Sequence, residues 1–471
     1  MTGMRVMDLL AIPHTRVVGF DGIHGRAVRS ISTDSRTLSK GDVFLAIRGE
    51  HFDGHEYVLR AHEAGALACI VSEAWIRRNA RLAEGARLLV VKDPVTALGD
   101  IAHLYRLRFT IPVLGITGSN GKTGTKDLVA AVLKTRGPIL RTEGNRNNRI
   151  GLPLTLLALR PSHQAAVVEL GTNQYGDIAT LCGIAMPTHG LITNIGRSHL
   201  QRLHSREGIA DEKGDLYRAL PPNGVAYLNA DEPLLRGVPR RSLSVLRFGM
   251  ARHADVRIAE LELDGNGRPR VRLFAPRFVK GAIEISMRVA GGHVAWMAAA
   301  ALAVGFSFGC ELDAMRRAIA SFTGEQGRLQ VRTVGGVRII DDTYNANPDS
   351  VIAALETLAA MQTEGRRIAV LGDMLELGAV SRAEHRAVGE ALQQLDIPYV
   401  FTLGSHARSL SAAAAARGRT TQHFTDTAAL QRALVSIADT GDTILVKGSR
   451  GMRMDEVVAA LERDLQPADG D

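Results

Sequence analysis

The segment Gly118-Ser119-Asn120-Gly121-Lys122-Thr123 contains the side chains that a phosphate-binding loop needs. Its two glycines permit a tight turn and a close approach of backbone amides to phosphate oxygens. Lys122 supplies a positive charge for the outer phosphates, and the Thr123 hydroxyl supplies a ligand for Mg²⁺. The general pattern has a glycine where Ile116 stands here, so the loop is a shortened form. We predict that residues 118–123 bind the phosphates of ATP.

The sequence around this loop predicts the elements that would hold it. Residues 111–116 form an apolar run typical of a buried strand, and residues 127–134 predict a helix that ends at Gly137-Pro138. A strand, loop and helix in this order direct backbone N–H groups and the helix N-terminus at a bound phosphate. The loop alone is compatible with GTPases, helicases, kinases and ligases.

Length and composition narrow the class. At roughly 100–200 residues per domain, 471 residues suggest about three domains. The net charge of +8 fits an anionic partner, but Lys and Arg are spread along the chain. Aromatic residues make up only 4%, which argues against a surface that stacks bases. We therefore expect no nucleic-acid partner.

The cysteines and the apolar runs indicate the cellular compartment in which the protein acts. Cys69, Cys182 and Cys310 are an odd and sparse set, which fits a reducing cytoplasm. No stretch of about 20 apolar residues is present, and the start of the chain is too short and polar for a signal peptide. We expect a cytoplasmic protein without a transmembrane segment that acts as a monomer.

Strand and helix patterns alternate along the chain, which predicts an α/β fold with three domains. We expect a smaller N-terminal α/β domain in residues 1–110. A central domain of the phosphate-loop NTPase type, with a parallel sheet, would follow in residues 111–322. A Rossmann-like, doubly wound C-terminal domain would occupy residues 323–471. The predicted strands besides 111–116 are residues 43–47, 68–71, 165–170, 190–194, 225–229, 337–340, 368–371, 399–403 and 443–446, and further helices are residues 293–305 and 350–361.

Several motifs of the sequence resemble those of the Mur ligases, which are ATP-dependent amide ligases of peptidoglycan synthesis. Residues 115–123 resemble the ATP signature of that family. Other segments resemble family motifs and occur in the same order: residues 142–153, 169–171, 194–200, 212–215, 341–348, 371–378 and 447–450.

Within the family, the resemblance is greatest to members that add a dipeptide. Residues 33–36, 41–44 and 53–55 resemble their uridine-nucleotide domain, and the Asp-Asn-Pro-Arg motif of diaminopimelate-adding members is absent. The resemblance implies UDP-N-acetylmuramoyl-tripeptide and D-alanyl-D-alanine as substrates, with ATP and Mg²⁺. The alternatives are a diaminopimelate- or lysine-adding ligase, folylpolyglutamate synthase, a phosphate-loop motor acting on nucleic acid, and a binding protein without catalysis. Residues 1–110 argue against folylpolyglutamate synthase, which lacks such a domain.

One carboxylate, that of Glu169, lies at a position suited to a metal ligand. Glu169 ends the apolar run 165–168, and the C-terminal end of a parallel strand faces the ligand crevice. Mg²⁺ prefers oxygen ligands, so Glu169 and Thr123 are predicted to bind it. The resemblance adds His199 at a second metal position and Lys213 as a carbamylated lysine, because only the carbamate form could ligate Mg²⁺.

The remaining roles follow from the resemblance. Arg328 would reach the γ-phosphate from the third domain, which places it with Lys122, Lys213 and His199 in the catalytic group. Asn145, Asp342 and Asn345 would contact the nucleotide. The predicted substrate-binding residues are Ser35, Arg36, His51, Asp53 and His55 for the uridine end, Asn147 and Asn347 near the reacting groups, and Lys447, Ser449 and Arg450 for the dipeptide carboxylate.

Two positions depart from the family pattern. Gly124 stands where many relatives have Thr. Met297 stands four residues after His293, where relatives usually have Asn. A methionine cannot make the amide hydrogen bonds to adenine that Asn can make. We therefore expect adenine to be held by apolar packing, with Trp296 nearby.

Overall fold

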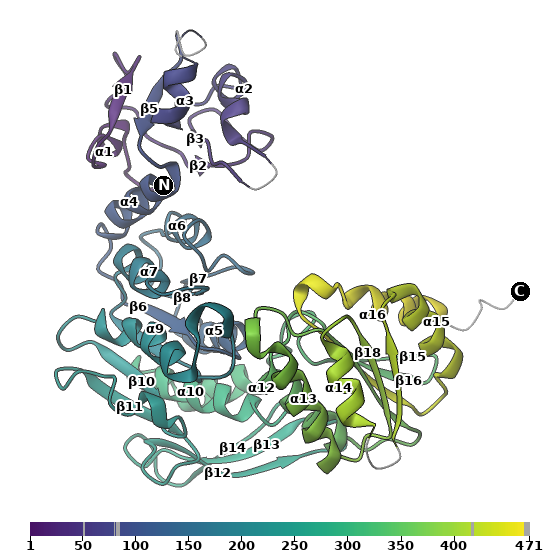
Figure 1. Ribbon diagram of the computed structural model, residues 1–471. Coiled ribbons are helices and arrows are strands. Elements are labelled where there is room, and N and C mark those ends of the chain that lie inside the picture. Colours follow the sequence, from purple (N-terminus) through teal and green to yellow (C-terminus); the bar gives the residue numbers. More distant parts are fainter. Residues whose placement is uncertain (50–51, 80, 82–84, 416–418, 466–471) are drawn as a thin grey trace, which may run out of the picture.

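The chain folds into three α/β domains, each with its own sheet. The computed structural model describes residues 1–49, 52–79, 81, 85–415 and 419–465. Figure 1 shows the N-terminal domain above the central domain, with the C-terminal domain beside the latter. The predicted fold class is confirmed. No helix in these described ranges is long and apolar enough to cross a membrane.

The N-terminal domain has a five-stranded sheet in the order β1-β5-β4-β3-β2, parallel except at β1. The predicted strands 43–47 and 68–71 correspond to β3 and β4. Its elements are α1 (Val6–Leu9), β1 (Arg16–Val18), β2 (Ile31–Ser32), β3 (Val43–Leu45), α2 (Val58–Glu63), β4 (Ala68–Ser72), α3 (Glu73–Arg78) and β5 (Leu88–Val91).

Helix α4 (Pro94–Arg106) joins the N-terminal domain to the central domain. Asp93 caps its start by accepting hydrogen bonds from the backbone amides of Val95 and Thr96. Near its end, the Tyr105 hydroxyl donates to the carbonyl of Leu159 at 2.8 Å. Helix α4, assigned by the prediction to the N-terminal domain, therefore also packs on the central domain.

The central sheet has nine strands in the order β14-β13-β12-β11-β10-β9-β6-β8-β7. The seven strands β6 to β12 pair in parallel, which agrees with the predicted parallel sheet. Strands β13 and β14 extend one edge in antiparallel pairing. The elements are β6 (Val113–Thr117), α5 (Lys122–Leu133), β7 (Ile139–Arg141), α6 (Gly151–Leu156), β8 (Ala165–Glu169), α7 (Asp177–Ala185), β9 (His189–Ile192), α8 (Leu200–Leu203), α9 (Arg206–Arg218), β10 (Val225–Asn229), β11 (Ser244–Gly249), β12 (Val256–Leu263), β13 (Pro269–Phe274), β14 (Ala282–Ser286), α10 (Val294–Ser307) and α11 (Leu312–Ala320).

The C-terminal sheet has the order β15-β16-β20-β17-β18-β19, with only β15 antiparallel to its neighbour. The carboxyl ends of β16 and β20 lie together, because Asp342 pairs in register with Lys447. The elements are β15 (Gln330–Val334), β16 (Val337–Asp342), α12 (Pro348–Ala360), β17 (Arg367–Gly372), α13 (Ser381–Ala391), β18 (Tyr399–Leu403), α14 (Ala407–Ala414), β19 (Thr420–Phe424), α15 (Thr427–Ile437), β20 (Thr443–Lys447) and α16 (Asp455–Asp464).

Candidate active site

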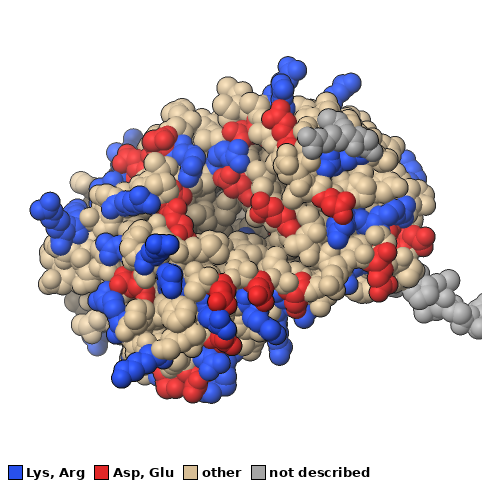
Figure 2. Space-filling view, turned by 90° about the horizontal axis from the view of Figure 1, so that it is seen from below, with Lys and Arg blue, Asp and Glu red and all other residues tan. Residues whose placement is uncertain are grey.

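A cavity of about 1230 Å³ lies between the central and C-terminal domains. Its walls include the loop before α5, the end of β8, the start of α10 and the segment after β16. The face drawn in Figure 2 is hollowed near its centre, and Lys and Arg alternate over it with Asp and Glu instead of gathering in one patch. The cavity is the candidate site because the predicted phosphate loop opens into it.

The phosphate loop is held by glycine geometry. A Cβ on Gly118 would lie 1.8 Å from Thr193 Oγ1, and Gly121 adopts the left-handed conformation at the start of α5. Lys122 Nζ donates to the carbonyl oxygen of Gly118 at 2.7 Å, so the charge lies inside the loop. Burial lowers the pKa of Lys122, whereas the Glu169 carboxylate acts to raise it. Phosphate oxygens bound here would further favour the charged form.

Ser119 and Asn120 support the loop rather than leaving their side chains free. Ser119 Oγ donates to the carbonyl of Gly196 at 3.1 Å, and the Asn120 backbone amide donates to Asn194 Oδ1 at 2.9 Å. Asn347 Nδ2, from the C-terminal domain, donates to Asn120 Oδ1 at 2.7 Å. The loop is therefore fixed to its own domain and to the opposite one.

Glu169 ends β8 as predicted, with its side chain 2% exposed. Its Oε1 accepts a hydrogen bond from Asn147 Nδ2 at 2.8 Å. Its Oε2 is buried and has no hydrogen-bond partner in the described part of the chain. A buried carboxylate oxygen without a partner is costly unless a cation or donor joins it, so Glu169 fits a magnesium ligand. Asn147, predicted to bind substrate, orients this carboxylate.

Lys213 lies on α9 and is 1% exposed. Burial, followed by the charge of Lys122, lowers the pKa of Lys213 well below its ordinary value, and Glu212 only partly opposes this. A lowered pKa favours the neutral amine, which is the form that reacts with CO₂ to give a carbamate. Lys213 is not among the residues that line the cavity directly.

His199 lines the cavity and pairs with the C-terminal domain. Its Nδ1 lies 2.7 Å from Glu376 Oε2, and both residues have positive φ, at 54° and 62°. The hydrogen bond from His199 lowers the pKa of Glu376. No three His, Cys, Asp or Glu side chains within the described ranges group into a metal site by themselves. The predicted metal role of His199 stays a prediction.

Arg328 reaches the phosphate loop from the start of the C-terminal domain, just before β15. Its Nη2 donates to Thr123 Oγ1 at 3.1 Å, and its guanidinium carbon lies 3.9 Å from the centre of the Tyr344 ring. Its Nε lies 3.5 Å from Glu325 Oε2. Stacking and pairing hold the guanidinium at the edge of the phosphate site, which fits the predicted contact with the γ-phosphate.

The predicted C-terminal residues divide into two groups. Asp342, Asn345, Asn347 and Lys447 line the cavity, whereas Ser449 and Arg450 do not. Lys447 is 3% exposed, and its Nζ donates to Asp342 Oδ2 at 2.6 Å and to the carbonyl of Asn345 at 2.9 Å. Ser449 Oγ donates to the carbonyl of Ala346 at 3.2 Å. Lys447 and Ser449 thus organise the segment after β16, and their dipeptide contact remains a prediction.

The predicted uridine-binding residues that the structure describes lie in the N-terminal domain and do not line this cavity. Asp53 Oδ1 lies 2.6 Å from His55 Nδ1, and His55 Nε2 accepts a hydrogen bond from the amide of Ser72 at 3.0 Å. Both nitrogens of His55 therefore support the local fold. The exposed Arg36 pairs with Asp34 and lowers the pKa of that carboxyl to about 2. Ser35 is half-buried, and His51 lies outside the described residues.

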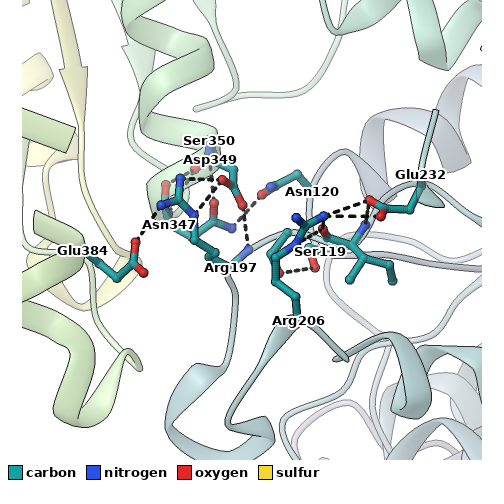
Figure 3. A network of polar contacts seen from close by, with 11 residues as sticks. Ser119, Asn120, Arg197, Arg206, Glu232, Asn347, Asp349, Ser350 and Glu384 are labelled. Atoms are coloured by element: carbon teal, nitrogen blue, oxygen red, sulfur yellow. Dashed lines mark hydrogen bonds and ion pairs between the residues drawn. The ribbon is translucent and has the colours of Figure 1, made fainter. Parts of the chain in front are cut away.

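The site also contains residues that the sequence did not assign. Arg197 Nη2 lies 2.7 Å from Asp349 Oδ1, and Arg197 Nη1 lies 2.8 Å from Glu384 Oε2, both across the domain boundary. Arg206 donates to the carbonyl of Ile195 and pairs with Glu232 (Figure 3). These contacts fix the segment 194–200, to which Arg197 belongs. Arg197 belongs to the motif at residues 194–200, but nothing in the sequence indicates its partners.

The other residues discussed from the sequence differ in their position relative to the cavity. Asn145 is exposed and does not line the cavity, whereas Trp296 and Met297 do. Cys69, Cys182 and Cys310 are free thiols and are buried, as small apolar side chains often are.

Family models match all three domains of this chain. The Mur ligase middle domain matches residues 116–305, the Mur ligase glutamate ligase domain matches residues 327–450, and the Mur ligase family catalytic domain matches residues 27–106. Together with the relatives below, these matches show that the chain belongs to the Mur ligase family.

The similar proteins described next are all named as the D-alanyl-D-alanine-adding member of that family. UDP-N-acetylmuramoyl-tripeptide–D-alanyl-D-alanine ligase of Escherichia coli is 36% identical over 441 residues, or 92% of this chain and 94% of the relative. The crystal structure of MurF from Acinetobacter baumannii is similar with a TM-score of 0.88 and 31% identity over 98% of each chain. The MurF ligase of Thermotoga maritima in complex with ADP has a TM-score of 0.81 and 29% identity, covering 93% of this chain and 98% of that one.

Proposed function

We propose that this protein is an ATP-dependent ligase that joins D-alanyl-D-alanine to UDP-N-acetylmuramoyl-tripeptide. The products are the UDP-linked pentapeptide, ADP and phosphate. The full-length similarity to ligases of that name supports the substrates. The site observation that carries the reaction type is the convergence of Lys122, the unpaired oxygen of Glu169 and Arg328 on one cavity.

The reaction needs two displacements at crowded, negatively charged centres. A carboxylate oxygen of the tripeptide attacks the γ-phosphorus of ATP, an O–P bond forms, and the bond to ADP breaks. The amine of the dipeptide then attacks the acyl carbon and loses a proton, and phosphate leaves. Catalysis of this kind depends on positioning and on cations that offset the developing charge.

The chain's own groups fit these demands. Lys122 and the helix N-terminus at the start of α5 hold the β- and γ-phosphates. Arg328 approaches from the opposite domain, and so its contact with the phosphoryl group depends on the closed arrangement of the two domains. His199 and Asn347 belong to the same interdomain contact region and help to hold that arrangement.

Magnesium belongs to this proposal as the ion held by Thr123, Glu169 and a carbamate on Lys213. Bound there, Mg²⁺ would offset the repulsion between the peptide carboxylate and the triphosphate. The unpartnered Oε2 of Glu169 and the buried amine of Lys213 support this assignment.

The dipeptide acceptor is proposed to bind beside the C-terminal domain, near Asn345, Asn347 and Arg450. The uridine end of the other substrate would lie on the N-terminal domain, near Ser35, Arg36 and Asp53. We also propose that the protein acts as a cytoplasmic monomer. The free, buried cysteines and the nucleotide-linked substrate support the location.

The acceptor specificity provides the test. Phosphate release is measured with ATP and UDP-N-acetylmuramoyl-tripeptide while D-alanyl-D-alanine, diaminopimelate, lysine, glutamate or RNA is added in turn. Only the dipeptide should stimulate release. Stimulation by a single amino acid would favour an amino-acid-adding ligase, and stimulation by RNA would favour a nucleic-acid motor.

A further inference from the structure

The two departures from the family pattern touch each other. Met297, at the start of α10, lies over the first turn of α5. A Cβ on Gly124 would lie 3.0 Å from Met297 Sδ and 3.1 Å from its Cε, and a Cβ on Gly121 would lie 3.2 Å from the same Cε. A larger residue at position 124 would therefore displace Met297. The thioether of Met297 fits here because positions 121 and 124, at the N-cap and in the first turn of α5, are both glycine.

The sheet order indicates which part of the nucleotide lies there. Strand β6 leads into the phosphate loop, β8 with Glu169 lies on one side of it, and β9, β10 and β11 lie on the other. The reacting carboxylate and the metal belong on the β8 side, and so the base extends toward β10, β11 and α10. The cavity there is lined by apolar side chains, namely Phe248, Val289, Val294, Met297, Ala300 and Phe322.

The polar side chains at this end are already engaged. Trp296 Nε1 donates to Asp231 Oδ2 at 2.7 Å, and Asp231 also accepts from the backbone amides of Met250 and Ala251. Asn229 Nδ2 donates to the carbonyl of Thr193 at 2.8 Å, and its Oδ1 accepts from the amide of Asp231 at 3.0 Å. The indole of Trp296 has a single N–H, so it would have to break this bond to donate to a base.

One polar atom at this end has no partner. His293 Nδ1 is buried without a hydrogen bond to the described residues. The charges of Asp342 and Lys447 in the C-terminal domain act on His293, so the residue lies near that domain. We assign His293 no contact with the base.

We propose that Met297, seated on Gly121 and Gly124, forms the base-contacting wall of the nucleotide site, and that the site selects purines by shape rather than by their exocyclic groups. ATP and GTP are then both accepted as phosphoryl donors. A polarizable thioether packs well against an aromatic ring and does not distinguish an amino group from a carbonyl. Apolar pockets discriminate weakly, whereas a site built on hydrogen bonds rejects the wrong partner strongly. The inference rests on the proposed nucleotide site.

Equilibrium binding tests the selectivity without any ligation. Displacement of a fluorescent ATP analogue is measured with ATP, GTP and CTP. We expect the affinities for ATP and GTP to agree within about tenfold, and Met297→Asn to increase the preference for ATP by about tenfold, since it adds one amide hydrogen bond. A preference of the unaltered protein for ATP of about 100-fold or more would overturn the proposal.

A double-mutant cycle tests the contact itself. Gly124→Ala should weaken ATP binding about fivefold or more, whereas the same change made together with Met297→Ala should cost little beyond Met297→Ala alone. Gly183→Ala in α7 is the matched control, because a Cβ there meets nothing within 4 Å. Equal effects of Gly124→Ala with and without Met297 would overturn the contact.

Ligation with ATP, D-alanyl-D-alanine and UDP-N-acetylmuramoyl-tripeptide is measured on the same samples. Nucleotide binding as expected but without ligation would contradict the proposed function and not the base site. Normal ligation together with strong rejection of GTP would contradict the base site alone.

Discussion

Arg197 of the central domain is bound to Asp349 of the C-terminal domain, with 2.7 Å between Nη2 and Oδ1. The backbone amide of Arg197 also donates to Asp349 Oδ2 at 2.6 Å, and Arg197 Nη1 reaches Glu384. Asp349 lies in the first turn of α12, two residues after Asn347, which contacts the phosphate loop through Asn120. One side chain therefore helps to set the domain arrangement that brings Arg328 to Thr123.

Replacing Arg197 by Ala should separate the domains without unfolding them. Asp349 and Glu384 would lose their shared cation, and bonds to charged groups of this kind are worth roughly 1.5–3 kcal/mol each. We expect kcat to fall about tenfold or more, the solution radius of gyration by X-ray scattering to increase, and the melting temperature to change little. Arg386→Ala is the control, because its partner Glu390 lies on the same exposed surface of α13. An unchanged scattering profile with unchanged kcat would show that Arg197 does not set the arrangement.

Lys122→Ala should abolish phosphoryl transfer while the protein stays folded. Removing one preorganised cation or donor from a transition state typically costs roughly 100- to 1000-fold, and Lys122 lies inside the loop itself. We expect a loss of about 1000-fold in phosphate release and an unchanged melting curve. Lys134→Ala, at the exposed end of the same helix, should behave like the unaltered protein. Activity retained in Lys122→Ala would favour a binding protein without catalysis.

The stability of the protein should depend on pH through Glu325. Burial and the neighbouring Asp127 raise the pKa of Glu325 to about 7, although Lys126 and Arg328 oppose this. An unfolded Glu has a pKa of about 4.3. Between these values the folded protein keeps a proton that the unfolded chain has lost, so the free energy of unfolding falls as pH rises.

The Gln variant isolates this effect. Glu325→Gln should melt about 2–4 °C higher than the unaltered protein at pH 8 and nearly equal to it at pH 5, by scanning fluorimetry. The exposed Glu143→Gln is the control. Melting temperatures of Glu325→Gln that run parallel to those of the unaltered protein at every pH would contradict the raised pKa.

Lys213 should carry a carbamate. Burial lowers the pKa of its amine well below the ordinary value, which favours reaction with CO₂. The equally buried Lys126 instead donates to the carbonyl of Thr142 and lies near Asp127. We expect ¹³C-bicarbonate to label one lysine, and removal of CO₂ to lower activity reversibly. Lys213→Ala should lose about 100-fold in kcat and lose the label. Full activity with a free ammonium at Lys213 would exclude the carbamate.

The parts of the site that are built from one short stretch of the chain could be predicted from the sequence. The loop between β6 and α5 and the carboxylate at the end of β8 follow from one strand and its next few residues, and both lie in the cavity as expected. Strands β6, β8, β9 and β10 were predicted for the same reason. Strand β7 was not predicted, because it has only three residues. Strands β11 to β14 were not predicted either, because their mixed or alternating burial is unlike the continuous apolar runs used to find the others.

Contacts between domains could not be predicted. Arg197 and Asp349 are 152 residues apart, and their pairing depends on how two separately folded units meet. The same limit applies to His199 with Glu376. Met297 and Gly124 lie in one domain, but their contact depends on how α10 packs on α5. Lys447 was expected to bind the dipeptide carboxylate, but its pairing with Asp342 depends on the register of β16 and β20, which no sequence motif specifies.

The central claim is tested most directly by identifying the product. The protein is incubated with ATP, UDP-N-acetylmuramoyl-tripeptide and D-alanyl-D-alanine, and mass spectrometry is used to quantify the uridine-linked peptide while ADP is counted. The account predicts one UDP-linked pentapeptide for each ADP and each phosphate, and neither product with Lys122→Ala. Hydrolysis of ATP without the pentapeptide, or a tetrapeptide made from a single amino acid, would contradict it.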